Sequence, residues 1–121
     1  MSVLIVDDHA MFRVRARAIL EAAGLDVIGE AEDAASALAQ VAALHPDVVL
    51  LDIQLPDEDG FAVAEKLDGG AQAPAVVLVS TRDALDFGSK LRNAKALGFI
   101  QKDDLSGTTL REILGDRGDP R

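Results

Sequence analysis

The sequence predicts an α/β fold in which helices cover both faces of a parallel β-sheet. Five short apolar runs are nearly continuous in Val, Leu and Ile, which is typical of strands buried on both faces. Their expected starts, near residues 2, 26, 47, 75 and 97, lie 24, 21, 28 and 22 residues apart. Each interval holds one helix and its turns, as a crossover between parallel strands requires. Strict alternation of strands and helices therefore predicts a doubly wound (βα)5 sandwich.

The expected strands fix where a ligand would bind. They are Val3–Val6, Val27–Gly29 with its flanks, Val48–Ile53, Val76–Val79 and Phe99–Ile100 with its flanks. Right-handed crossovers restrict the order of these strands. The flavodoxin-like order 2-1-3-4-5 places the first strand beside the third, and ligands bind at the carboxyl ends of those two strands.

Four of the intervening segments have the periodicity of helices. In the first segment, the expected apolar face is formed by residues at helical spacing, Met11, Val14, Ala18 and Ile19. Arginines lie on the other faces of this helix. The second helix is expected at Ala34–Leu44, capped by Asp33 and ended before Pro46. The third is expected at Phe61–Leu67 before two glycines, and the fifth begins near Ser106.

The fourth helix is expected to be late and short. Gly88 costs about 1 kcal/mol relative to Ala in a helix interior, and the aspartates before it prefer turns. The sequence predicts a long loop and then a helix at roughly residues 87–96, with Leu85 and Phe87 packed inward. Segments of low stability are the ones that move in switches, so this region is expected to respond to changes at the ligand site.

Composition excludes several classes of protein. The 121 residues are 49% hydrophobic and suit one domain, with an expected core at 2–114 and a frayed tail at 115–121. Cys is absent, so no disulfide or thiolate metal site forms. No apolar run approaches the ~20 residues that span a bilayer, and the N-terminus lacks the basic start of a signal peptide. We expect a cytoplasmic protein with no membrane partner.

The charge balance restricts the partners. Twelve basic against 21 acidic residues give a net charge of −9, which phosphate backbones repel. No direct contact with nucleic acid is therefore expected, and a divalent cation or a basic protein surface fits better.

Three carboxylates are expected together at the carboxyl edge of the sheet. Asp7 and Asp8 end the first strand, and Asp52 ends the third. Two carboxylates about 4 Å apart repel by about 4 kcal/mol at an effective dielectric constant near 20, so the cluster needs a counter-ion. Hard oxygen ligands suit Mg²⁺. The alternative is that Asp7 and Asp8 only cap the first helix.

Two further polar residues belong to the same edge. Ser80 ends the fourth strand and Lys102 follows the fifth. A lysine is a natural counter-ion for the acids, and a hydroxyl can donate to a phosphoryl oxygen. The alternatives are that Ser80 caps the next helix and that Lys102 is a solvated charge.

These motifs resemble the receiver domain of two-component response regulators. The resemblance spans residues 2–114, with 28 residues from Asp52 to Ser80 and 22 from Ser80 to Lys102. The matching segments are VLIVDDH with Asp7 and Asp8, VVLLDIQLPDEDG with Asp52, VVLVS with Ser80, and GFIQK with Phe99 and Lys102.

The resemblance implies a phosphorylation site and its metal. Asp52 matches the residue that accepts a phosphoryl group from a sensor histidine kinase or a phosphotransfer protein. Asp8 matches a direct ligand of Mg²⁺, Asp7 an acid that binds it directly or through water, and the carbonyl of Gln54 a further ligand beside Asp52. The expected protein is a signalling domain rather than an enzyme, with only its own phosphotransfer and slow autodephosphorylation.

The resemblance also implies a switch. Lys102 matches the lysine that contacts the phosphoryl group, Ser80 the hydroxyl that turns toward it, and Phe99 the aromatic residue that changes rotamer. The output surface would then be the face formed by the fourth helix, the fifth strand and the fifth helix. Through this face the domain would signal to a downstream protein or form a phosphorylation-dependent homodimer. Asp103 stands where many receivers have Pro, as in receivers attached to helix-turn-helix domains. His9 follows the acidic pair and is expected to face solvent at the start of a helix; the alternative is that it is a metal ligand or a phosphate shuttle.

Other functions predict other residues. A phosphatase with an aspartate nucleophile would have a D-x-D motif after the first strand, and a nucleotide or flavin binder would have a Gly-rich or Ser/Thr-rich loop there. A pseudo-receiver that only binds protein would have lost Asp52, Lys102 or one of the paired acids. A phosphorelay carrier remains open, and the domain is expected either to stand alone or to belong to a regulator with a helix-turn-helix output domain.

Overall fold

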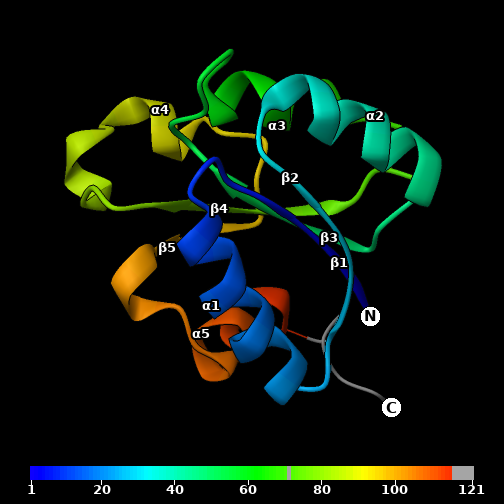
Figure 1. Ribbon diagram of the computed structural model, residues 1–121. Coiled ribbons are helices and arrows are strands. Elements are labelled where there is room, and N and C mark those ends of the chain that lie inside the picture. The colour runs from blue at the N-terminus through cyan, green and yellow to red at the C-terminus, as the bar shows by residue number, and fades with distance from the viewer. Residues whose placement is uncertain (71, 116–121) are drawn as a thin grey trace.

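The computed structural model describes residues 1–70 and 72–115, and within them five parallel strands form one sheet (Figure 1). The order of the strands is β2-β1-β3-β4-β5, which confirms the predicted topology. Their bounds are β1 Ser2–Val6, β2 Asp26–Ala31, β3 Val48–Asp52, β4 Ala75–Ser80 and β5 Gly98–Gln101. A frayed tail is predicted at 115–121, and residues 116–121 of it lie outside the described residues.

The helices divide between the two faces of the sheet. Their bounds are α1 Ala10–Ala22, α2 Ala34–Leu44, α3 Gly60–Leu67, α4 Ser89–Arg92 and α5 Gly107–Leu114, with turns of 3-10 helix at Ala84–Asp86 and Lys102–Asp104. Helices α1 and α5 cover one face, and α2, α3 and α4 cover the other (Figure 1). Among the described residues, no helix combines the length and the apolar character needed to cross a membrane.

The central strands form the core because both of their faces are covered. Every residue of β3 and β4 is buried. Successive side chains of a strand point to opposite faces, so Ile5 and Leu50 pack toward α1 and α5, whereas Leu4 and Leu51 pack toward α2 and α3. The continuous apolar runs of the sequence follow directly from this double burial.

The cap predicted at Asp33 is present, and Ser106 caps α5 in the same way. The Asp33 carboxylate accepts a hydrogen bond of 2.8 Å from the backbone N–H of Ser36, and the Ser106 hydroxyl accepts one of 3.0 Å from that of Thr109. Each side chain satisfies a backbone donor in the first turn that has no partner within the helix. Helices α2 and α5 therefore begin where the sequence predicts.

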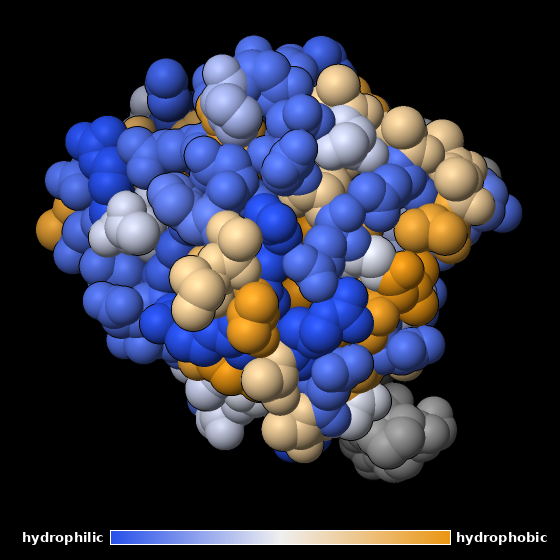
Figure 2. Space-filling view, in the orientation of Figure 1, coloured by the Kyte–Doolittle hydropathy of each residue, from blue (hydrophilic) through white to orange (hydrophobic). Residues whose placement is uncertain are grey.

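The apolar face predicted for α1 is wrong at Met11, Val14 and Ala18, which are exposed, whereas Ile19 packs against the core. Met11 is 79% exposed and Val14 is 63% exposed. Figure 2 shows apolar and strongly hydrophilic surface side by side over the region where α1 lies in Figure 1. The buried residues are Phe12, Ala16 and Leu20. Both sets of residues have helical spacing, so periodicity alone cannot choose between them.

The fourth helix begins late, as predicted, but is shorter than expected. It covers only Ser89–Arg92 and follows a 3-10 turn, so the predicted extension to residue 96 is wrong. Phe87 packs against the core as expected, with its ring centroid 5.7 Å from that of Phe61. Leu85 does not pack inward, since it is 89% exposed.

The loop between β3 and α3 is tied to the neighbouring helix. The Asp57 carboxylate accepts hydrogen bonds of 2.8 and 3.1 Å from the backbone N–H groups of Ala34 and Ala35. These bonds at the start of α2, above all the one from Ala34, lower the pKa of Asp57. The loop that follows the end of β3 is thereby held against the start of α2.

Candidate functional site

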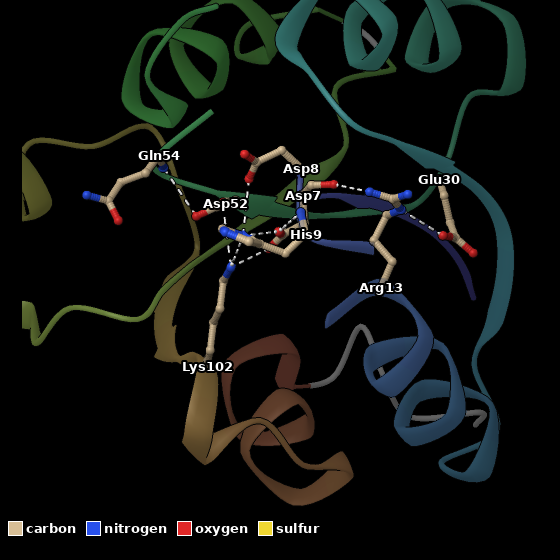
Figure 3. Close-up of polar contacts among 8 residues, drawn as sticks. All are labelled: Asp7, Asp8, His9, Arg13, Glu30, Asp52, Gln54 and Lys102. Atoms are coloured by element: carbon tan, nitrogen blue, oxygen red, sulfur yellow. Dashed lines mark hydrogen bonds and ion pairs between the residues drawn. The ribbon is translucent and has the colours of Figure 1, made fainter. Parts of the chain in front are cut away.

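The predicted acidic residues meet at the carboxyl edge of the sheet (Figure 3). Asp7 and Asp8 follow β1, and Asp52 is the last residue of the adjacent β3. One ligand atom from each of these residues and from His9 lies within 4.8 Å of the others. Gly60 packs directly against the backbone at the end of β3, where a Cβ would stand 2.5 Å from the Asp52 carbonyl oxygen.

Lys102 is the internal counter-ion of this cluster. It is 5% exposed, and Asp7 and Asp52 are 0% and 1% exposed. Its Nζ lies 2.7 Å from Asp7 Oδ2 and 3.6 Å from Asp52 Oδ2. The ammonium also lies 4.6 Å from the centroid of the Phe12 ring, a favourable position for a cation. Lys102 is therefore buried among the acids, and the alternative of a solvated charge is wrong.

The environment of Asp52 opposes its ionisation. Burial, and next the negative charge of Asp7, raise the pKa of Asp52 from 3.8 to about 6. Lys102 and a hydrogen bond of 3.2 Å from the backbone N–H of Gln54 to Asp52 Oδ1 act in the opposite direction. Asp52 is thus ionised near pH 7 but at a cost in folding free energy.

The residues fit a divalent cation. One ammonium stands against three carboxylates, so two negative charges remain when all three are ionised. Within the described residues, Asp7 Oδ2 and Asp52 Oδ2 are buried and accept no hydrogen bond of acceptable geometry, although the Lys102 ammonium is near both. Buried carboxylate oxygens in this situation are suitable ligands for Mg²⁺.

Neither aspartate after β1 caps α1. His9 is the N-cap residue of α1, and the cap has no side-chain hydrogen bond. Asp7 Oδ1 instead accepts a hydrogen bond of 2.8 Å from the backbone N–H of His9, ahead of the helix. The alternative that these acids only cap a helix is therefore wrong.

The other predicted residues lie at the edge of this cluster. The backbone of Gln54 contacts Asp52, while its side chain is exposed. Ser80 is fully buried, and its hydroxyl accepts a hydrogen bond of 3.0 Å from the backbone N–H of Arg82. Phe99 packs on the α4 side of the sheet, with its ring centroid 6.0 Å from that of Phe87. The switch roles of Ser80 and Phe99 stay predictions.

His9 lies closer to the site than the sequence predicts. Its side chain is 65% exposed, yet ring Nδ1 lies 3.1 Å from Asp7 Oδ1 and 3.2 Å from Asp8 Oδ1. Figure 3 shows the ring over the carboxylates. The predicted solvent exposure of His9 at the start of a helix is confirmed, but the contacts of its ring with the two acids were not expected. The one feature of the sequence that indicates this proximity is that His9 directly follows the two acids.

Two arginines of α1 hold the backbone around the site. Arg13 Nη1 donates to the carbonyl oxygen of Asp7 at 2.6 Å, while its Nε donates to Glu30 at 3.0 Å. Arg15 Nη2 donates to the carbonyl oxygen of Lys102 at 2.8 Å. The sequence places these residues on the polar faces of the helix, but their partners on other elements are not visible in it.

Comparisons with known proteins agree with this geometry. The family model described as the response regulator receiver domain matches residues 3–114. The signal receiver domain of NarL from Mycobacterium tuberculosis superposes with a TM-score of 0.83 at 33% identity, covering 99% of this chain and 97% of that one.

Curated relatives have several activities. Protein-glutamate methylesterase/protein-glutamine glutaminase 2 of Cereibacter sphaeroides is 39% identical over 117 residues, covering 94% of this chain and 32% of that protein. The DNA-binding transcriptional activator EvgA of Escherichia coli is 28% identical over 102 residues, covering 84% and 50%. The chain thus spans half or less of these relatives. Because one of them is named as DNA-binding, the expectation that nucleic acid is no partner is not supported.

Proposed function

The chain belongs to the response regulator receiver domain family, and we propose that it accepts a phosphoryl group on Asp52 from a sensor histidine kinase or a phosphotransfer protein. The observation that supports this most is the buried Asp52 carboxylate, with Lys102 and Asp7 around it, at the end of a central strand. Receiver domains serve two-component signalling, and the phosphotransfer is our proposal for this chain.

The two oxygens of Asp52 have different surroundings. Oδ1 accepts the hydrogen bond from Gln54, whereas Oδ2 accepts none among the described residues and lies 3.6 Å from Lys102 Nζ. In the proposed step one carboxylate oxygen of Asp52 forms a bond to the phosphorus of a phosphohistidine, and the bond from phosphorus to nitrogen breaks. Its electron pair leaves with the imidazole, which takes a proton from water.

Charge neutralisation carries most of the catalysis in such a step. Lys102 is held where it can stay paired with Asp7 and also approach an oxygen on Asp52. Asp7, Asp8, Asp52 and the carbonyl of Gln54 would hold Mg²⁺. When bound, Mg²⁺ neutralises the charge of the phosphoryl oxygens. The phosphoryl group then biases the neighbouring switch residues.

The output surface in this proposal is the face formed by α4, β5 and α5. A groove of about 380 Å³ lies there, lined by residues of the loop after β4, of β5 and of α5 that include Asp83, Phe99 and Ile113. Phe99 joins this groove to the apolar cluster under α4. A change of its rotamer would alter a surface for a downstream protein or for a second copy of the domain. A phosphorelay carrier would use the same site.

Acetyl phosphate labelling tests the proposed function. Incubation with acetyl phosphate and Mg²⁺ is expected to add one phosphoryl group, detected by intact-protein mass spectrometry. A chelator present during the incubation should prevent this labelling. No labelling would support a pseudo-receiver, and steady release of phosphate would support a phosphatase.

Mg²⁺ is expected to stabilise the fold because it neutralises the carboxylates of the site. At a concentration tenfold above its Kd, the free energy of unfolding should rise by about 1.4 kcal/mol. Urea unfolding with and without Mg²⁺ measures this gain. Asp8→Ala should abolish it, while Asp68→Ala, an exposed acid after the far end of α3, should retain it. Identical unfolding of the wild-type protein at every Mg²⁺ concentration would contradict the metal site.

Phosphorylation is expected to change amide exchange in residues 81–114. The long loop and the four-residue α4 lie in this segment, and few backbone hydrogen bonds protect such a region. Hydrogen–deuterium exchange of the Mg²⁺-loaded protein, with and without beryllofluoride as a phosphoryl mimic, measures the change. The Asp52→Asn variant with the same mimic is the control. Unchanged exchange here together with changes elsewhere would assign the output to another surface.

A further inference from the structure

We propose that His9 is a nitrogen ligand of the metal at this site, and that it makes the site prefer a transition cation such as Co²⁺ or Ni²⁺ to Mg²⁺. The inference rests on the metal-dependent function proposed above and deepens it. It starts from the ring nitrogen of His9, which shares a region 4.8 Å across with the ligand atoms of three carboxylates.

The distances around His9 suit a shared ion. Ligands bound at 2.0–2.2 Å and at right angles around one cation lie about 3 Å apart. His9 Nδ1 lies 3.1 Å from Asp7 Oδ1 and 3.2 Å from Asp8 Oδ1. An ion bound by these three atoms would therefore need little movement of the side chains.

Lys102 and His9 use different oxygens of Asp7. The ammonium contacts Oδ2 at 2.7 Å, whereas the imidazole contacts Oδ1 at 3.1 Å. A cation on the Oδ1 side would leave the contact between Lys102 and Asp7 in place. Lys102 Nζ also lies 3.5 Å from His9 Nδ1, so the ammonium would have to turn away from the ring when the cation binds there. The buried Oδ2 of Asp52, which accepts no hydrogen bond within the described part of the chain, is a separate indication that the cluster takes a cation.

The backbone holds the ring in this position. His9 is the N-cap of α1, and its N–H donates to the same Asp7 Oδ1 at 2.8 Å. Because the side chain is 65% exposed, a metal from solvent can reach Nδ1 without opening the core. Carboxylates alone suit Mg²⁺, whereas an imidazole nitrogen favours transition metals. The chemistry of this donor set therefore differs from that of an oxygen-only site.

The first test uses the wild-type protein loaded with Mn²⁺. Pulsed EPR is expected to show coupling of the electron spin to a directly bound imidazole nitrogen. This coupling should be absent in His9→Ser and present in His45→Asn, which removes the other histidine at a left-handed position that Asn tolerates. Ser is a good N-cap, so α1 should still form. Bound Mn²⁺ without nitrogen coupling in the wild-type protein would overturn the proposal.

The second test compares affinities by calorimetry. His9→Ser should weaken Co²⁺ binding by about tenfold or more and change Mg²⁺ binding less than about twofold, because Mg²⁺ depends on the carboxylates. An equal loss for both metals would also overturn the proposal. Mg²⁺-dependent labelling of the wild-type protein is measured alongside. Labelling without nitrogen coupling would support the proposed function and contradict the role of His9. Absence of labelling would contradict the proposed function, independently of what the EPR experiment shows for His9.

Discussion

Asp52→Asn is expected to abolish phosphoryl labelling while leaving the fold intact. The amide lacks the anionic oxygen that forms the bond to phosphorus, and it has nearly the same shape as the carboxylate. Labelling by acetyl phosphate and Mg²⁺ should therefore fall from one group per chain to background in intact-protein mass spectrometry.

Asp59→Asn is the matched control for this substitution. Asp59 lies on the loop that follows β3 and caps α3 through a hydrogen bond of 2.9 Å from the N–H of Ala62, a role that Asn also fills. This variant should be labelled like the wild-type protein. A phosphoryl group retained in Asp52→Asn, located by peptide mapping, would show that another residue is the acceptor.

The same Asp52→Asn substitution is expected to stabilise the metal-free protein at neutral pH. The pKa of Asp52 is raised from 3.8 to about 6, chiefly by burial and then by Asp7. At 1.36 kcal/mol for each pKa unit, ionised Asp52 destabilises the fold by about 3 kcal/mol. The neutral amide does not carry this cost, so the variant should gain up to that amount.

The raised pKa of Asp52 determines how the stability difference between the variant and the wild-type protein changes with pH. The folded state holds the Asp52 proton more tightly than the unfolded state, so the wild-type protein loses stability as pH rises from about 4 to about 6. Asn does not titrate. The difference between the variant and the wild-type protein should be near zero below pH 4, grow through this window and stay constant above it.

Urea unfolding in the presence of a chelator at several pH values measures this difference. Mg²⁺ should reduce it, because a bound cation stabilises the ionised carboxylate of the wild-type protein. Asp59→Asn should show no such pH-dependent gain. Equal stability of Asp52→Asn and the wild-type protein from pH 5 to 8 would show that burial does not oppose ionisation of Asp52.

The sequence alone determined the sheet and the meeting of the acids. Val48–Asp52 and Ala75–Ser80 are apolar almost throughout, and only strands covered on both faces have this composition. Once strand 1 lies beside strand 3, their carboxyl ends coincide, so residues that end these strands, Asp7 and Asp52, must be neighbours. Local caps such as Asp33 depend on adjacent residues and were predictable for that reason.

The tertiary structure decided the contacts that join distant elements. Periodicity shows that α1 is a helix but not which stripe faces the sheet, and packing against α5 and β1 selects Phe12, Ala16 and Leu20 over Met11 and Val14. The direction of the His9 ring, the pairing of Lys102 with Asp7 and the exposure of Leu85 were decided in the same way. Each depends on how rigid elements from different parts of the chain pack in space, and residue spacing along one element does not contain that information.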